Sequence, residues 1–112
     1  MRIYIAGPLT ADTDEAILHN CQRAIDAGIE LMRMGHVPFV PHLMQWFDAR
    51  AKSEGVNFSW EEYINWCLAW IEQCEALLFL GPSPGADVEL EAAKKAGKRI
   101  FYSVDEVQYV GL

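Results

Sequence analysis

Short apolar runs alternate along the chain with longer segments in which apolar residues recur every three or four positions. The runs RIYIAG (2–7), LLFL (77–80) and RIFYSV (99–104) are typical of strands buried on both faces. HVPFVP (36–41) predicts a further strand, in which Pro38 indicates an edge position or an early end. The pattern therefore predicts four strands separated by helical segments.

Helical spacing predicts three helices between these strands. The first begins at Thr13 or Asp12, since either side chain can cap it, and glycine at position 35 ends it. The second opens with the capping box Ser59-Trp60-Glu61-Glu62. The third follows the loop GPSPG and ends at the glycine of KKAGKR. Residues 42–58 between the second strand and the capping box are expected to be irregular or partly helical.

Strands joined by helices of ten or more residues imply right-handed crossovers and a parallel sheet, which helices must cover on both faces. We therefore expect a single domain over residues 1–112. Its fold class is α/β, a three-layer doubly wound arrangement with a parallel sheet of four to five strands in the order 2-1-3-4. The tail DEVQYVGL (105–112) would supply either a short helical turn or the fifth strand.

A glutamate lies at the edge of the face that the last helix must turn toward the sheet. At 100° per residue, the apolar stripe of this helix comprises Ala86, Leu90, Ala93, Ala96 and Gly97. Glu89 lies on the flank of that stripe, near the end of the preceding strand. A carboxylate there costs free energy unless it is paired or has a chemical role. Glu89 is therefore either a structural partner of Arg2 or Arg99, or a site residue.

Composition narrows the range of partners. The net charge of −7 argues against a nucleic acid polymer or an anionic membrane as partner, since both favour basic patches. The three cysteines are odd in number and lack metal-binding spacing, so we expect reduced thiols, no metal and no cofactor. Neither a signal-like segment nor an apolar run of about 18 residues occurs. We expect a soluble, cytoplasmic protein that binds a small molecule.

Two loops carry the most suggestive chemistry at the carboxyl ends of the predicted strands. Gly7-Pro8-Leu9-Thr10 follows the first strand, and Gly81-Pro82-Ser83-Pro84-Gly85 follows the third. Each loop precedes a helix, whose N-terminus can receive a small anion. In open parallel sheets, ligands bind outside the carboxyl ends of the strands, so the two loops predict one cleft that includes Glu89.

These segments resemble the nucleoside 2-deoxyribosyltransferase superfamily, which includes the deoxynucleoside monophosphate N-glycosidases and small uncharacterised families. The resemblance is carried by IYIAGP near the N-terminus and PSPGADVELEAAKKAGKRI near the C-terminus. The matching positions are Tyr4, Gly7, Pro82, Ser83, Gly85, Glu89, Ala93, Gly97 and Lys98. The resemblance implies a Rossmann- or flavodoxin-like fold and a homo-oligomer, a dimer or larger.

The resemblance also implies roles for individual residues. Glu89 would be the nucleophile that attacks the anomeric carbon of a 2-deoxyribosyl group, giving a covalent glycosyl-enzyme intermediate. Water would resolve this intermediate in a hydrolase, and a second nucleobase in a transferase. Ser83 matches the position that holds a 5′-phosphate, which favours nucleotides, although it also suits a plain N-cap. Tyr4 would orient Glu89 by a hydrogen bond, or else only pack in the core. Gly7, Pro8 and Gly85 would line the cleft.

One position departs from the superfamily pattern. Counting eight residues back from Glu75 reaches Cys67, where the superfamily has an aspartate that assists the departing base. A thiol is a poor general acid, so another group would have to act. The candidates are His42 and Asp48, which would lie across the cleft from Glu89. Alternatively, His42 only caps local backbone and Asp48 is solvated surface.

Two hypotheses for function follow. The first is an enzyme that cleaves or transfers the N-glycosidic bond of a deoxyribonucleoside or deoxyribonucleotide. The second is a nucleotide-binding module of the same fold without turnover, which the cysteine favours. A group of aromatic residues could stack a nucleobase, cover the site or form a subunit interface. This group comprises Trp46, Phe47, Trp60, Tyr63, Trp66 and Trp70.

Overall fold

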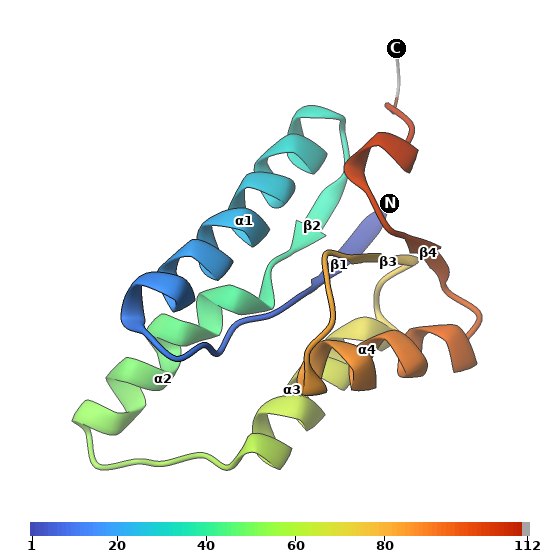
Figure 1. Ribbon diagram of the computed structural model, residues 1–112. Helices are drawn as coiled ribbons and strands as arrows, with labels where there is room; N and C mark the ends of the chain where they lie inside the picture. The colour runs from blue at the N-terminus through green and yellow to red at the C-terminus, as the bar shows by residue number, and fades with distance from the viewer. Residues whose placement is uncertain (111–112) are drawn as a thin grey trace.

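A computed structural model of the chain describes residues 1–110 (Figure 1). The elements in chain order are β1 (Arg2–Ala6), α1 (Asp14–Arg33), β2 (Val37–Phe39), a 3-10 turn (Pro41–Leu43), α2 (Met44–Ser53), α3 (Trp60–Glu72), β3 (Ala76–Phe79), α4 (Pro84–Lys95), β4 (Arg99–Phe101) and a second 3-10 turn (Val104–Glu106). The segment predicted to be irregular or partly helical thus contains α2.

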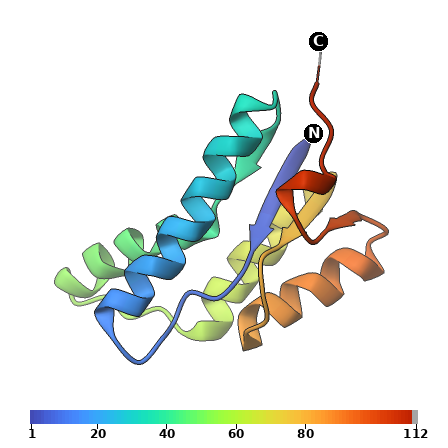
Figure 2. The same cartoon turned by 45° about the horizontal axis from the view of Figure 1, so that its top comes forward.

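The four strands form one parallel sheet in the order β2-β1-β3-β4, which confirms the predicted fold class and strand order. In this register Tyr4 of β1 lies between Phe39 of β2 and Leu77 of β3. All carboxyl ends therefore meet at one edge of the sheet. Figure 2 shows β1 running toward the loop that leads into α1, at the end where α4 begins.

The strand predicted over 99–104 ends at Phe101 instead. The backbone N–H of Tyr102 donates to the Glu106 carboxylate at 2.8 Å, and the Ser103 hydroxyl accepts from the backbone of Asp105 at 3.2 Å. These local bonds turn the chain out of the sheet. The tail supplies the short helical turn rather than a fifth strand up to residue 110, and positions 111–112 of that prediction lie outside the described residues.

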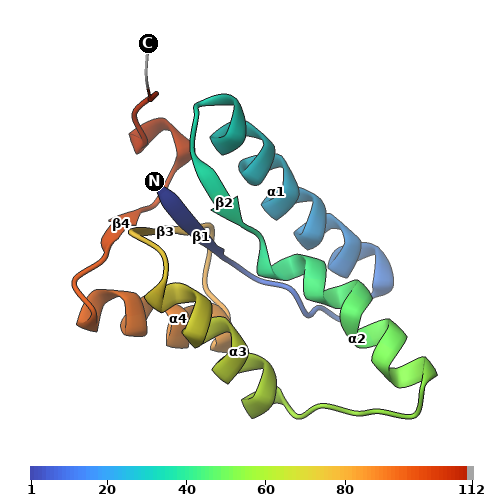
Figure 3. The ribbon, with the colours of Figure 1, turned by 180° about the vertical axis from the view of Figure 1, so that it is seen from behind.

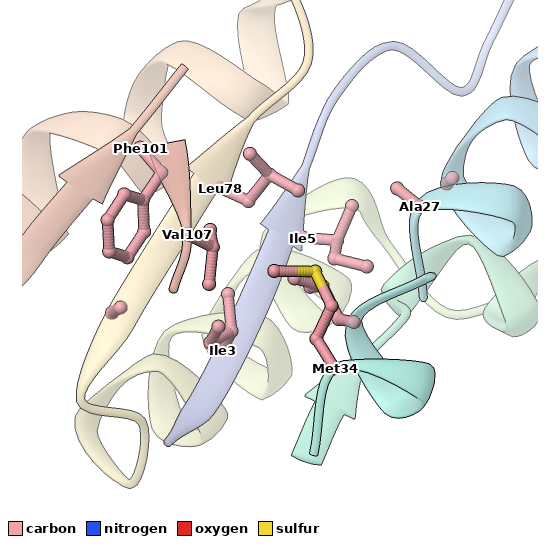
Figure 4. Close-up of a cluster of buried hydrophobic side chains, with 10 residues drawn as sticks. Ile3, Ile5, Ala27, Met34, Leu78, Phe101 and Val107 are labelled. Carbon is pink, nitrogen blue, oxygen red and sulfur yellow. The ribbon is translucent and has the colours of Figure 1, made fainter. Parts of the chain in front are cut away.

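The sheet separates two apolar cores, as a three-layer fold requires. Alternate residues of a strand point to opposite faces, so Ile3 and Ile5 face α1 while Tyr4 faces α3 and α4. Figure 3 shows α1 on one side of the sheet and α3 with α4 on the other. Figure 4 shows the core under α1, in which Ile3, Ile5, Ala27, Met34, Leu78, Phe101 and Val107 gather around β1 and β3.

Local signals determine where the helices begin and end. The Thr13 hydroxyl accepts from the backbone N–H of Ala16 at 3.1 Å and caps α1, so Thr13 rather than Asp12 is the capping residue. Gly35 follows α1 with a φ of +92°, a left-handed conformation that favours glycine. The predicted capping box at the start of α3 is present, with reciprocal bonds between Ser59 and Glu62.

Helix α4 buries most of the predicted apolar stripe together with Glu89. The buried positions are Ala86, Glu89 and Ala93, and Leu90 packs against the same core. Ala96 is exposed because α4 ends at Lys95 and Ala96 is its C-cap. Glu89 therefore belongs to the face that α4 turns toward the sheet and α3.

Candidate active site

A cavity of about 320 Å³ lies at the carboxyl ends of β1, β2 and β3. Five segments form its wall: the loop after β1, the 3-10 turn after β2, and the beginnings of α2, α3 and α4. The lining residues are Gly7, Leu9, Thr10, Pro41, His42, Met44, Gln45, Asp48, Trp60, Tyr63, Ile64, Cys67, Ser83, Pro84, Gly85, Ala86 and Glu89. Segments from both halves of the chain thus converge on one hollow.

Most residues that the sequence singled out meet at this cavity. Its lining includes Gly7, Ser83, Gly85, Glu89, His42 and Asp48. Pro8 is the exception, because it is absent from the lining and instead turns its carbonyl oxygen toward the His42 ring. Tyr4 is also absent from the lining, since it is fully buried in β1, and it reaches the site through its hydrogen bond to Glu89.

Glu89 is a buried carboxylate held by a hydroxyl. Only 6 % of its surface is exposed, and the Tyr4 hydroxyl donates to Glu89 Oε2. Burial raises the pKa of Glu89 to about 7, while the hydrogen bond from Tyr4 and the thiol of Cys67 act in the opposite direction. At neutral pH the carboxyl is therefore divided between its protonated and ionised forms.

The two arginines considered as structural partners of Glu89 have other contacts. Arg2 Nε lies 2.8 Å from Glu75 Oε1 in an exposed ion pair. The Arg99 guanidinium lies over the Phe101 ring at 5.1 Å from its centroid. Neither forms an ion pair with Glu89 within residues 1–110, so the interpretation of Glu89 as half of a salt bridge is wrong.

Tyr4 combines core packing with the contact to Glu89. Its ring stacks on Phe39 at a centroid distance of 5.6 Å, and no part of the side chain is exposed. Burial, followed by the charge of Glu89, raises the pKa of the Tyr4 hydroxyl far above its ordinary value. The hydroxyl therefore stays protonated and acts as a permanent donor to Glu89.

Cys67 lies in the cavity wall close to Tyr4 and Glu89. The thiol is 7 % exposed, and its Sγ lies 3.8 Å from the sulfur of Met44. Burial raises the pKa of Cys67 to about 12, and the charge of Glu89 acts in the same direction. Cys67 is therefore a neutral thiol at physiological pH and neither a nucleophile nor a useful acid.

His42 holds the loop after β1. Its Nε2 lies 3.2 Å from the carbonyl oxygen of Gly7 and 3.1 Å from that of Pro8, so this nitrogen carries the proton and donates to both. The other ring nitrogen is buried without a partner among the described residues. Burial lowers the pKa of His42, so the ring is neutral. The alternative that His42 caps local backbone thus matches its contacts.

Asp48 is an ionised, hydrogen-bonded carboxylate rather than free surface. Lys52 Nζ lies 2.8 Å from Asp48 Oδ2, and the Tyr63 hydroxyl donates to Oδ1 at 2.6 Å. The hydrogen bonds from Lys52 and then Tyr63 lower the pKa of Asp48. An aspartate held in this way stays ionised and has no proton to donate to a departing group.

Ser83 caps α4 and also faces the cavity. Its hydroxyl oxygen accepts from the backbone N–H of Ala86 at 3.0 Å, and its hydroxyl proton is left for a ligand. Pro84 occupies the first turn of α4, where its missing N–H is not needed. The predicted N-cap and the predicted ligand contact are thus compatible in one side chain.

Ser83→Ala is expected to lower the free energy of unfolding by about 1 kcal/mol, because it removes the helix cap. It should also weaken ligand binding, because the hydroxyl proton is lost. Thr13→Ala is the matched control, since Thr13 caps α1 in the same way but does not line the cavity. Urea unfolding and ligand titration on both variants separate the two effects. Equal binding by both variants would show that Ser83 is a cap alone.

The cavity also contains residues to which the sequence gave no role. Leu9 and Thr10 belong to the loop predicted to form the cleft, and they contribute apolar surface and a hydroxyl. Met44, Gln45 and Ile64 line the cavity as well but were not predicted as site residues. No local pattern indicates Gln45, because its place depends on where α2 begins.

Within residues 1–110, no three histidine, cysteine or acidic side chains are grouped closely enough to hold a metal ion. None of the helices in this part of the chain combines the length and hydropathy needed to cross a membrane.

The fold and cavity define an α/β protein of Rossmann-like architecture, with a buried carboxylate in a hollow at the carboxyl ends of its parallel strands. Residues 1–102 match the model of a family described as a domain of unknown function, DUF4406. The chain belongs to this family. A comparison with curated proteins found no match.

Proposed function

We propose that this protein cleaves an N-glycosidic bond, or transfers the 2-deoxyribosyl group, of a deoxyribonucleoside or deoxyribonucleotide. The observation that carries the proposal is the Glu89 carboxylate, which lies in the cavity wall without an ion pair and is oriented by the Tyr4 hydroxyl. A buried carboxylate in a cleft, held by neutral groups alone, suits a nucleophile because it can reach an anomeric carbon without first breaking a salt bridge.

In this proposal Glu89 and Tyr4 act in a double displacement. The ionised Glu89 oxygen attacks the anomeric carbon, and the bond to the base nitrogen breaks with its electron pair going to the base. The Tyr4 hydroxyl keeps the other carboxylate oxygen in place. Water, or a second base, then attacks the same carbon, gives up a proton to solvent or to the first base, and releases the Glu89 carboxylate. The covalent intermediate divides one difficult substitution into two easier ones.

The test is incubation with a panel of nucleosides and their 5′-monophosphates, scored by chromatography for free base. Release of base by the wild-type protein, and its loss in Glu89→Gln, would support the proposal. A protein that binds members of the panel in a thermal-shift assay but releases no base from any of them would overturn it.

The second candidate function is nucleotide binding without turnover. The observation that favours it is Cys67, a neutral thiol in the cavity wall where the superfamily resemblance implies an aspartate. The same panel distinguishes the candidates, because a binding module would be stabilised by ligand without releasing base.

The proposal includes a homo-oligomer in the cytoplasm. Support for self-association comes from the exposed aromatic rings of α2 and α3, of which Trp46, Trp60 and Trp70 are each more than two-fifths exposed. On the same two helices Phe47 packs on Trp66, and it also packs on Phe58 of the connecting loop, which adds further apolar surface. The three free, buried cysteines are consistent with a reducing compartment. Sedimentation analysis tests the oligomer, and cell fractionation tests the location.

A further inference from the structure

We infer that the site takes N-glycosides whose base carries a positive charge and departs as a neutral molecule. The inference rests on the proposed function and adds the substrate class. It comes from the titratable groups that face the cavity and from what each of them is bonded to.

The charge of the departing base decides whether a glycoside-cleaving site must contain a general acid. An uncharged nucleoside loses its base as an anion unless an acid delivers a proton in the transition state. A base that is already positively charged accepts the electron pair of the broken bond and becomes neutral. Such a substrate needs the nucleophile but no acid.

The cavity holds a nucleophile but no free acid among its described lining residues. His42 is neutral, and its ring proton is committed to the carbonyl oxygens of Gly7 and Pro8. Asp48 is ionised between Lys52 and Tyr63. Neither group that sequence analysis offered as a replacement for the missing aspartate can therefore donate a proton.

The remaining titratable groups of the cavity wall cannot donate a proton to the base either. The Tyr63 hydroxyl donates to Asp48, and Cys67 is a thiol whose pKa burial raises to about 12. Glu89 can be nucleophile or acid but not both in one step. The site thus matches the requirements of a base that leaves without a proton.

The charge and surface of the wall also suit a cationic base. The ionisable groups that carry charge there are the carboxylates of Glu89 and Asp48, of which Asp48 is partly balanced by Lys52. The rings of Trp60 and Tyr63 line the same hollow, and aromatic faces attract cations. A base that departs as an anion would meet these carboxylates instead. At the start of α4, the N–H of Ala86 is already taken by Ser83.

The proposed step balances without a further reactant. Ionised Glu89 forms a bond to the anomeric carbon, and the carbon–nitrogen bond breaks with its electron pair going to the cationic base. Water then attacks the anomeric carbon, the Glu89 bond breaks, and the second proton of the water passes to solvent. The products are the free sugar, the neutral base and one proton.

Two isomers that differ in the position of one methyl group test the inference. Near neutral pH, 3-methyl-2′-deoxycytidine carries a positive base and 5-methyl-2′-deoxycytidine does not. We expect kcat/KM to favour the cationic isomer by about 100-fold or more, because the neutral isomer needs a general acid that the site lacks. Equal values for the two isomers, or a preference for the neutral one, would overturn the inference while leaving the proposed function intact.

Cys67→Asp supplies the sharper variant, because it places a carboxyl in the wall close to Glu89. Cleavage of the neutral isomer should rise relative to the cationic one, so the ratio between the isomers should fall by about tenfold or more. Cys67→Ser is the control without an acid and should keep the wild-type ratio. An unchanged ratio in a Cys67→Asp protein that melts cooperatively would count against the inference.

Failure of the proposed function would give a different result from failure of the charge preference. If wild-type protein releases base from neither isomer nor any member of the nucleoside panel, the cleavage proposal is wrong. Binding of the two isomers, measured by calorimetry, then decides the charge preference. Tighter binding of the cationic isomer supports charge selection by this cavity, and equal or weaker binding refutes it.

Discussion

Replacing Glu89 with glutamine is expected to abolish base release while the domain stays folded. Glutamine keeps the shape of the side chain and can still accept from the Tyr4 hydroxyl, but it cannot form the glycosyl bond. Loss of a nucleophile costs about three orders of magnitude or more in kcat. Turnover of the best nucleoside in the panel, measured by chromatography, checks this.

The same variant should be more stable than the wild type above neutral pH. Burial raises the pKa of Glu89 from 4.5 to about 7, so the folded state holds its proton more tightly than the unfolded chain does. The contribution of Glu89 to the free energy of unfolding is therefore fully present below pH 4.5, and it is lost as the pH rises through about 7. The loss amounts to about 3 kcal/mol, and glutamine does not suffer it.

Glu91→Gln is the matched control, since Glu91 lies on the same helix with 62 % of its side chain exposed. It should change neither turnover nor the pH dependence of stability. Urea unfolding of the three proteins at several pH values gives the comparison. A Glu89→Gln protein that loses stability at every pH, with activity falling only in proportion to folded protein, would make Glu89 a structural residue.

Tyr4→Phe is expected to shift the pH dependence of activity to higher pH. The hydroxyl stabilises ionised Glu89, so its removal raises the pKa of the carboxyl above about 7. A hydrogen bond to a charged group contributes about 1.5–3 kcal/mol, which corresponds to a shift of about one to two pH units. Activity at neutral pH should fall about 5- to 50-fold, since the wild-type carboxyl is already only half ionised there, and part of it should return in alkaline buffer.

Tyr102→Phe provides the control for this substitution, because Tyr102 is 56 % exposed and lies outside the cavity. Its pH–rate profile should match that of the wild type. A profile of kcat/KM against pH reports the ionisation in the free enzyme and is the measurement to make. If kcat/KM of Tyr4→Phe rises at the same pH as in the wild type, the hydroxyl does not control the ionisation of Glu89.

Much of the site could be predicted from the sequence, because the order of the strands in a parallel sheet determines which loops lie next to each other. Once the sheet is parallel with the order 2-1-3-4, the loops at Gly7 and Ser83 must lie at the same edge, and the residue after Pro41 must lie nearby. The resemblance added Tyr4 and Glu89 as a pair. What these residues do in solution stays a prediction.

The partners of individual side chains could not be read from local patterns. The periodicity of α4 extended the buried stripe to Ala96 and placed Glu89 on its flank, whereas the helix ends at Lys95 and the structure buries Glu89. A pattern gives the spacing of a helix, but the width of its buried face depends on the side chains of α3 and the sheet. Likewise, Asp48 and His42 could be named, but not their bonds to Lys52, Tyr63 and the loop carbonyls.

The sequence by itself determined the four strands, three of the four helices and the parallel order, because these depend on near neighbours and on the length of the crossovers. Thr13, Ser59 and Ser83 each cap a helix through a bond spanning three residues. Only the tertiary structure decided that Glu89 is held by Tyr4, 85 residues away, rather than by an arginine. That choice depends on strand register and helix rotation together, since both must be set before a strand hydroxyl meets a helix carboxylate.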